Sequence, residues 1–195
     1  MDLHEPREPV RAPGIARGRR TFFAPVWLLL VAAALFAALL FTLWRGQMTT
    51  SIIVVRHAEK QLGTIADPPL APEGQRRAHA LADLFATGRS VGAIQAIYVS
   101  NTRRARETAA PLALRLGLTP RDRDPRGVRA LAREILREHA GQVVLVVGHS
   151  NTVPPLISEL TEGRFQISMS EDDYGQLYIV SRPSVGPAGL VQMRF

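Results

Sequence analysis

The segment Gln142–Val147, QVVLVV, is the stretch of this sequence that most clearly decides the fold. A continuous run of β-branched and aliphatic residues is typical of a parallel strand that is covered on both faces. Two further runs, Ser51–Val55 (SIIVV) and Ala93–Val99 (AIQAIYV), have the same character. These three runs predict strands of one sheet.

Helical patterns separate the strands and follow them. The expected helices lie at about residues 72–88, 105–117, 124–139 and 152–161. Pro72 suits a first helical position, where its missing N–H does no harm, and Gly117 suits the position after a helix end. Asp124-Pro125 predicts the N-cap and first-turn proline of the third helix.

The order of these elements predicts the fold class. Residues 60–71 are expected to form a loop, and Gln176–Ser181 and Leu190–Phe195 are expected to form two late strands. Strands that alternate with helices indicate an α/β three-layer sandwich with a mainly parallel central sheet. This arrangement predicts one folded domain over residues 51–195.

Composition excludes several classes of function. The chain of 195 residues has no cysteine, which excludes disulfides, thiolate metal sites and a cysteine nucleophile. Its formal charge of +7 comes almost wholly from arginines that are scattered along the chain, and aromatic residues are only 6%. Because there is neither a basic stripe nor a stacking platform, we expect no nucleic-acid partner.

Residues 21–44 form a run without charge that predicts one transmembrane helix before the domain. The run is long enough to cross a hydrocarbon core of about 30 Å, and Trp27 and Trp44 lie towards its ends. We expect an uncleaved signal anchor. A cleaved signal peptide is the alternative, although no A-x-A site follows the run. Residues 1–20 are expected to be a disordered basic tail, and residues 45–50 a short tether.

The arginines that flank this run predict its orientation. Five precede it, and Arg45 alone follows it closely. The positive-inside tendency then keeps the N-terminus in the cytoplasm and places residues 46–195 across the membrane. We therefore expect a single-pass protein of a bacterial inner membrane with a periplasmic, or otherwise extracytoplasmic, domain.

Polar residues of one chemical kind follow each of the three predicted strands, as Arg56–Glu59 (RHAE), Ser100–Ala105 (SNTRRA) and Gly148–Thr152 (GHSNT). Taken singly, each histidine could be a hydrogen-bonded loop residue and each arginine a solvated one. Ligands in open α/β sheets bind outside the carboxyl ends of the strands, so these residues should meet at one edge. Forked arginine donors match phosphate geometry, and a histidine nitrogen is nucleophilic near neutral pH. The pattern predicts a pocket for phosphoryl transfer.

With these residues placed, the sequence resembles the histidine phosphatase superfamily, also called the phosphoglycerate mutase-like family. Arg56-His57 resembles its first signature, with Ala58 where glycine is common. Residues 70–76 (LAPEGQR) resemble the L-x-x-x-G-x-x-R opening of its first helix. Residues 100–109 (SNTRRARETA) resemble its S-x-x-x-R-A-x-x-T-A pattern, and residues 147–152 (VGHSNT) resemble the segment that holds its second histidine.

The resemblance implies roles for four residues. His57 would attack phosphorus and become phosphohistidine, and water would then hydrolyse this intermediate. Arg56, Arg104 and His149 would hold the phosphoryl group and stabilise its transition state, with Arg104 selected over Arg103 by the pattern. The resemblance implies no metal and no cofactor.

The general acid stays open at this point. Ser150 stands where one branch of the family has an aspartate after the second histidine. The acidic residues considered for this role are Asp122, Asp124, Glu134, Glu59 and Glu171, with no acid at all as the alternative. An absent acid would suit a good leaving group, such as that of a phosphoramidate. Tyr174 and Tyr178 are expected to pack on the sheet.

The expected function is therefore hydrolysis of a phosphomonoester or phosphoramidate, on a small phosphorylated substrate of the cell envelope. One alternative is a catalytically inactive membrane-anchored domain that binds phosphate or acts as a scaffold. Another is a phosphoglycerate mutase-type phosphotransferase, which is disfavoured because only short connections are available to close the site. The sequence predicts neither the natural substrate nor the oligomeric state.

Overall fold

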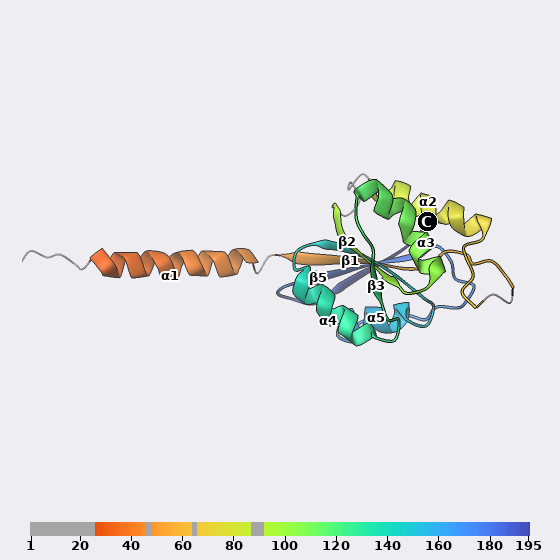
Figure 1. Ribbon diagram of the computed structural model, residues 1–195. Helices are drawn as coiled ribbons and strands as arrows, with labels where there is room; N and C mark the ends of the chain where they lie inside the picture. Colours follow the sequence, from red (N-terminus) through yellow and green to blue (C-terminus); the bar gives the residue numbers. More distant parts are fainter. Residues whose placement is uncertain (1–25, 46–47, 64–65, 87–91) are drawn as a thin grey trace, which may run out of the picture. The chain divides into compact units, whose positions relative to one another are not determined.

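The computed structural model describes residues 26–45, 48–63, 66–86 and 92–195 (Figure 1). An N-terminal helix and an α/β domain form two units. The predicted basic tail, residues 1–20, and the first residues of the predicted membrane span, residues 21–25, lie outside the described residues.

The first helix, α1 (Val26–Arg45), is apolar on every side. Its segment Val26–Leu43 has the length and composition that a membrane span requires. The side chains of residues 26–43 are all exposed, so no protein core covers the apolar surface. A soluble helix with this composition would normally be buried, which makes an anchor or a signal sequence the natural interpretation of α1.

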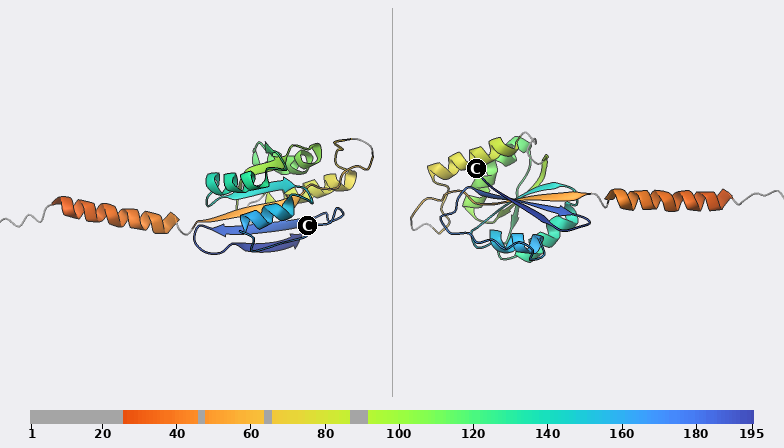
Figure 2. Two further views of the ribbon diagram at one scale, coloured as in Figure 1. Left: turned by 90° about the horizontal axis from the view of Figure 1, so that it is seen from below. Right: turned by 180° about the vertical axis from the view of Figure 1, so that it is seen from behind.

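The domain is built on a six-stranded mixed sheet with the order β3-β2-β4-β1-β5-β6. Its strands are β1 (Thr49–Arg56), β2 (Ile94–Ser100), β3 (Arg121–Arg123), β4 (Val143–Gly148), β5 (Gln176–Pro183) and β6 (Gly189–Arg194). The pairs β3–β2, β2–β4 and β4–β1 are parallel, and the pairs β1–β5 and β5–β6 are antiparallel. The last two strands form a hairpin at one edge, drawn in blue in Figure 2. The prediction of a mainly parallel sheet is confirmed.

Two helices cover each face of this sheet, which confirms the three-layer sandwich (Figure 1). They are α2 (Pro72–Phe85) and α3 (Arg103–Leu116) on one face, and α4 (Val128–Glu138) and α5 (Val153–Leu160) on the other. In β1, Ile53 and Val55 face α2 and α3, whereas Ile52 and Val54 face the opposite core. Each fully buried aliphatic side chain contributes about 1.5–3 kcal/mol, so the part of a central strand that is covered on both faces favours a continuous apolar run.

Two local features differ from the prediction. β3 is a short edge strand of sequence RDR, which has no apolar pattern to reveal it. The helix α4 begins at Val128, with Gly127 as its N-cap, so the prediction that Asp124-Pro125 starts this helix is wrong. Asp124 instead closes a turn, because its Oδ1 accepts the Arg126 N–H at 2.9 Å and its carbonyl accepts the Gly127 N–H at 3.0 Å.

Candidate active site

The register between β1 and β4 places the two predicted histidines side by side. Arg56 pairs with Gly148 across the two strands, and the His57 N–H donates to the Gly148 carbonyl at 2.9 Å. His57 and His149 each follow this pair directly, and their ring centroids lie 5.1 Å apart at an angle of 66°. The convergence predicted at the carboxyl ends of the strands is therefore present.

The turn after β4 holds His149 in place. The His149 N–H donates to Thr152 Oγ1 at 2.8 Å. A Cβ atom on residue 148 would lie 2.8 Å from the same oxygen and 3.3 Å from Val153 Cγ2, so a larger residue would displace the Thr152 side chain. Gly148 thus allows the start of α5 to approach the strand end that carries His149.

A buried threonine ties α3 to the segment after β1. The Ala58 N–H donates to Thr108 Oγ1 at 2.9 Å, and this hydroxyl donates to the Arg104 carbonyl at 2.7 Å. Thr108 is only 1% exposed. Arg104 lies one turn earlier on α3, and its Nε donates to His57 Nε2 at 3.1 Å. The first turn of α3 is therefore docked so that Arg104 meets the His57 ring.

The hydrogen bonds of His57 define its reactive atom. Nδ1 lies 2.8 Å from the Ala58 carbonyl, which can only accept, so Nδ1 carries the proton and Nε2 is unprotonated and accepts from Arg104. Burial lowers the pKa of His57 to about 3, with the charges of Arg104 and Arg56 acting in the same direction. Burial likewise lowers the pKa of His149 to about 4. Both rings are neutral at pH 7, and His57 Nε2 is available as a nucleophile.

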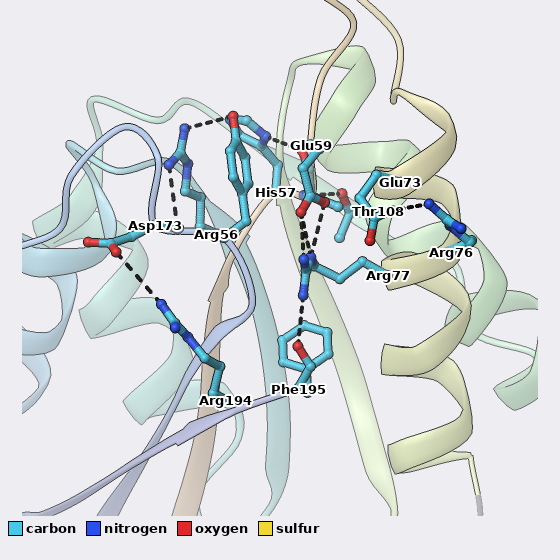
Figure 3. A network of polar contacts seen from close by, with 12 residues as sticks. Arg56, His57, Glu59, Glu73, Arg76, Arg77, Thr108, Asp173, Arg194 and Phe195 are labelled. Atoms are coloured by element: carbon cyan, nitrogen blue, oxygen red, sulfur yellow. Dashed lines mark hydrogen bonds and ion pairs between the residues drawn. The ribbon is translucent and has the colours of Figure 1, made fainter.

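Arg56 lies beside His57 and is held by the segment that precedes β5 (Figure 3). Its Nη1 donates to the Ser170 carbonyl at 3.0 Å and its Nη2 to the Tyr174 hydroxyl at 3.3 Å. The guanidinium carbon also lies 4.2 Å from the Tyr174 ring centroid. Arg56 Nε is buried without a hydrogen-bond partner, and an oxyanion would satisfy this donor.

One cavity of about 680 Å³ is lined by all four predicted site residues, Arg56, His57, Arg104 and His149. This volume lies in the usual range of small-molecule sites, about 300–1,000 Å³. The charged residues and histidines that line it are Arg56, His57, Lys60, Arg104, Arg126, His149 and Glu171. The chemistry available at its wall is a neutral imidazole nucleophile beside two guanidinium groups.

The family model of the histidine phosphatase superfamily (branch 1) matches residues 52–127, which include Arg56, His57 and Arg104. The resemblance to the histidine phosphatase superfamily is confirmed. His149 lies beyond the matched range, but the strand register places it in the same site.

Solved histidine phosphatase structures share the fold. The protein histidine phosphatase SixA complexed with tungstate has 22% identity and a TM-score of 0.59, with coverage of 74% of this chain and 96% of that chain. A mycobacterial glucosyl-3-phosphoglycerate phosphatase has 15% identity and a TM-score of 0.56, with coverage of 73% and 97% respectively. No curated protein matches the sequence. At these identities the structural likeness establishes the fold alone.

Glu59 is tied to α2, although it follows the histidine phosphatase signature directly. Arg77 binds its carboxylate with Nε at 2.9 Å and 3.0 Å and with Nη2 at 2.6 Å. The Arg77 Nη1 also donates to the Phe195 carbonyl at 2.8 Å (Figure 3). Glu59, one of the candidates for the general acid, is absent from the cavity wall and forms a stabilising contact with α2.

The motif at the start of α2 explains this contact. Counted from Leu70, the arginine of L-x-x-x-G-x-x-R falls on Arg77, one residue beyond the matched stretch 70–76. A Cβ atom on Gly74 would lie 2.2 Å from the Glu59 carbonyl oxygen, so glycine is required for α2 to approach the site segment. The motif therefore places the Arg77–Glu59 ion pair next to the segment that carries His57.

The remaining acid candidates divide clearly. Asp122 pairs with Arg106 at 2.7 Å, and Glu134 accepts the Arg123 Nε–H at 2.9 Å. Neither lines the cavity, and Asp124 closes the turn before α4. Among the acid candidates, all of which the structure describes, Glu171 alone lines the cavity.

The sequence reasoning missed two residues that shape the site. Asp67 accepts the Arg103 N–H at 2.9 Å and 3.1 Å and lies 3.4 Å from Arg104 Nη1. The first N–H of α3 thus has a carboxylate partner. Tyr174 packs against Arg56 and not on the sheet, whereas Tyr178 is buried in β5 as predicted.

Proposed function

We propose that the domain is a phosphatase that hydrolyses a phosphomonoester or phosphoramidate through a phosphohistidine on His57. The observation that carries this proposal is the hydrogen bond of 3.1 Å that Arg104 Nε donates to the unprotonated His57 Nε2 on the cavity wall. A phosphoryl group that binds here would place its oxygens on the arginine and its phosphorus in front of the imidazole nitrogen. This is the arrangement that nucleophilic attack requires.

The reaction follows from these contacts. A phosphoryl dianion replaces His57 as the partner of Arg104 and satisfies the free Nε of Arg56. His57 Nε2 forms a bond to phosphorus as the bond to the leaving group breaks, and the Nδ1–H bond to the Ala58 carbonyl stabilises the imidazolium that forms. Water then attacks phosphorus, the P–N bond breaks, and inorganic phosphate leaves. His149 supports both steps by binding a phosphoryl oxygen.

The proton donor to the leaving group depends on the substrate. The position of Glu171 on the cavity wall supports it as the donor for an ester, and a phosphoramidate would need no such residue. Convergence of Arg56, His57, Arg104 and His149 favours an enzyme over a scaffold that binds phosphate. None of the chemistry proposed requires a metal or cofactor.

We also propose that α1 anchors the phosphatase in a bacterial inner membrane. The apolar exposed surface of Val26–Leu43 supports a single membrane span. The excess of arginine before the span supports a cytoplasmic N-terminus and an extracytoplasmic domain. A small phosphorylated molecule of the envelope would then be the substrate.

The test is hydrolysis of p-nitrophenyl phosphate by the full-length protein in detergent, with EDTA present. The matched variants are His57→Asn, which removes the nucleophile, and Arg133→Gln, which changes an exposed arginine outside the cavity. Turnover by the wild type and Arg133→Gln, with none by His57→Asn, is the expected result. Equal turnover by His57→Asn would overturn the assignment of the nucleophile.

A further inference from the structure

Most of the basic side chains in the described part of the domain have a carboxylate partner. Among the lysine and arginine side chains that the structure describes there, those without an ion pair are Arg56, Lys60, Arg126, Arg133 and Arg164. Three of these five, Arg56, Lys60 and Arg126, line the cavity that holds His57. Unpaired positive charge is therefore concentrated at this cavity.

Lys60 and Arg126 have no part in the phosphoryl site described above. Lys60 lies three residues after His57 and is half-buried, and its backbone forms a bridge with Leu70. Arg126 lies in the turn before α4, where its N–H is bound by Asp124 at 2.9 Å. Both backbone positions are thus held by local hydrogen bonds.

The two side chains reach the cavity from different strands of the sheet. Lys60 follows β1 and Arg126 follows β3, and the sheet order places β2 and β4 between these two strands. Together with Arg56 and Arg104, they give the cavity wall four cations. Glu171 is the one carboxylate on this wall, and Asp67 pairs with Arg104 at 3.4 Å. Like charges around one cavity repel each other, so this arrangement becomes favourable when an anion is bound.

We propose that Lys60 and Arg126 form a second anion subsite, which binds a carboxylate or phosphate carried by the leaving part of the substrate. The substrates are then small phosphate esters with a second anionic group. This inference rests on the proposed function, in which Arg56 and Arg104 bind the transferred phosphoryl group. A cavity of about 680 Å³ leaves room for such a leaving part beyond the phosphoryl group.

The test compares two esters that differ in one charge. These are 4-carboxyphenyl phosphate and 4-carbamoylphenyl phosphate, in which a neutral amide replaces the carboxylate. The quantity measured is kcat/KM for the carboxyphenyl ester divided by kcat/KM for the carbamoylphenyl ester, for the full-length protein in detergent. Differences in leaving-group reactivity cancel when this ratio is compared between the wild type and its variants. Hydroquinone bisphosphate, as a third ester, shows whether a phosphate serves in place of the carboxylate.

The variants are Lys60→Gln, Arg126→Gln, the double variant, and Arg133→Gln as the control that removes the same charge elsewhere. We expect the ratio to fall about tenfold in the double variant, as for two partly screened ion pairs, and to stay unchanged in Arg133→Gln. The wild-type preference for the carboxylate should also shrink as salt is raised. An unchanged ratio in the double variant, or an equal fall in Arg133→Gln, would overturn the subsite.

The matching phosphonates separate this inference from the proposed function. 4-Carboxyphenylphosphonate and 4-carbamoylphenylphosphonate bind without being cleaved, so calorimetry reports the subsite even when no ester is hydrolysed. If no ester is turned over but the carboxylate analogue binds more tightly, and this preference is lost in the double variant, the subsite stands and the phosphatase proposal fails. If both analogues bind the wild type equally, the subsite fails whatever the turnover.

Discussion

Replacement of Thr108 by valine tests whether the link between α3 and the site segment positions Arg104. Valine has nearly the same shape as threonine but lacks the hydroxyl that joins the Ala58 N–H to the Arg104 carbonyl. Ala58 is 1% exposed, so its N–H would be left buried and without a partner. Such a group costs about 1–3 kcal/mol in the free energy of unfolding. For a domain of this size that loss lowers Tm by about 2–12 °C.

The same change should also impair catalysis. Arg104 contacts His57 Nε2 through a single hydrogen bond of 3.1 Å. The position of α3 against the site segment sets the position of the Arg104 backbone, and therefore of its guanidinium group. A displacement of about 1 Å in a catalytic group can reduce the rate about a hundredfold. We expect kcat/KM for p-nitrophenyl phosphate to fall by about tenfold to a hundredfold in Thr108→Val, measured well below its Tm.

Thr161→Val is the matched control for this experiment. Thr161 is also buried, at 2% exposure, and its hydroxyl donates to the Ile157 carbonyl at 2.7 Å and accepts the Phe165 N–H at 3.3 Å. It takes no part in the site, so its loss should lower Tm and leave kcat/KM intact. If Thr108→Val kept wild-type kcat/KM while losing stability, the positioning argument would be refuted.

Three further predictions follow from the supporting contacts and from the histidines. Gly74→Ala places a Cβ atom 2.2 Å from the Glu59 carbonyl, so it should destabilise the domain by at least about 1–3 kcal/mol in chemical denaturation. Burial raises the pKa of Glu59, but the hydrogen bonds and charge of Arg77 outweigh it and hold this pKa below its usual value. Glu59→Gln should therefore lower stability at pH 7 while turnover persists, and its deficit should shrink as the pH falls below about 4.5; an undiminished deficit at pH 3 would contradict this. Because burial lowers the pKa of His57 to about 3 and that of His149 to about 4, the unfolded chain takes up their protons first. Acidification below about pH 6.5 should then destabilise the domain, by up to about 1.4 kcal/mol per pH unit for each histidine, and NMR should find both rings neutral at pH 5.

The sequence was most informative where burial dictates residue type. The positions of β1 and β4 that are covered on both faces, residues 52–55 and 143–147, are apolar, so the residues that follow them, Arg56-His57 and Gly148-His149, could be recognised as the strand ends. The parallel pairing of such strands then brings the two histidines together without any further assumption.

The remaining features lacked a local signal. β3 is a polar edge strand, and its sequence RDR has none of the alternation that marks a half-buried strand. Asp124-Pro125 fits the start of a helix as well as the turn that it forms, and only the tertiary structure chooses between them. Long-range contacts such as Tyr174 with Arg56 and Asp67 with α3 come from loops, where no periodicity indicates which side chains will meet.

The most direct test of the central claim is to trap and locate the covalent intermediate. The full-length protein would be mixed with p-nitrophenyl phosphate, quenched in alkaline denaturant within the first turnovers, digested and mapped by mass spectrometry. The account predicts a phosphoryl group on His57 that survives base, is lost in acid, and is absent from His57→Asn. A phosphoryl group on His149 or on any other residue, or sustained turnover with no phosphorylated His57 at any time, would contradict it.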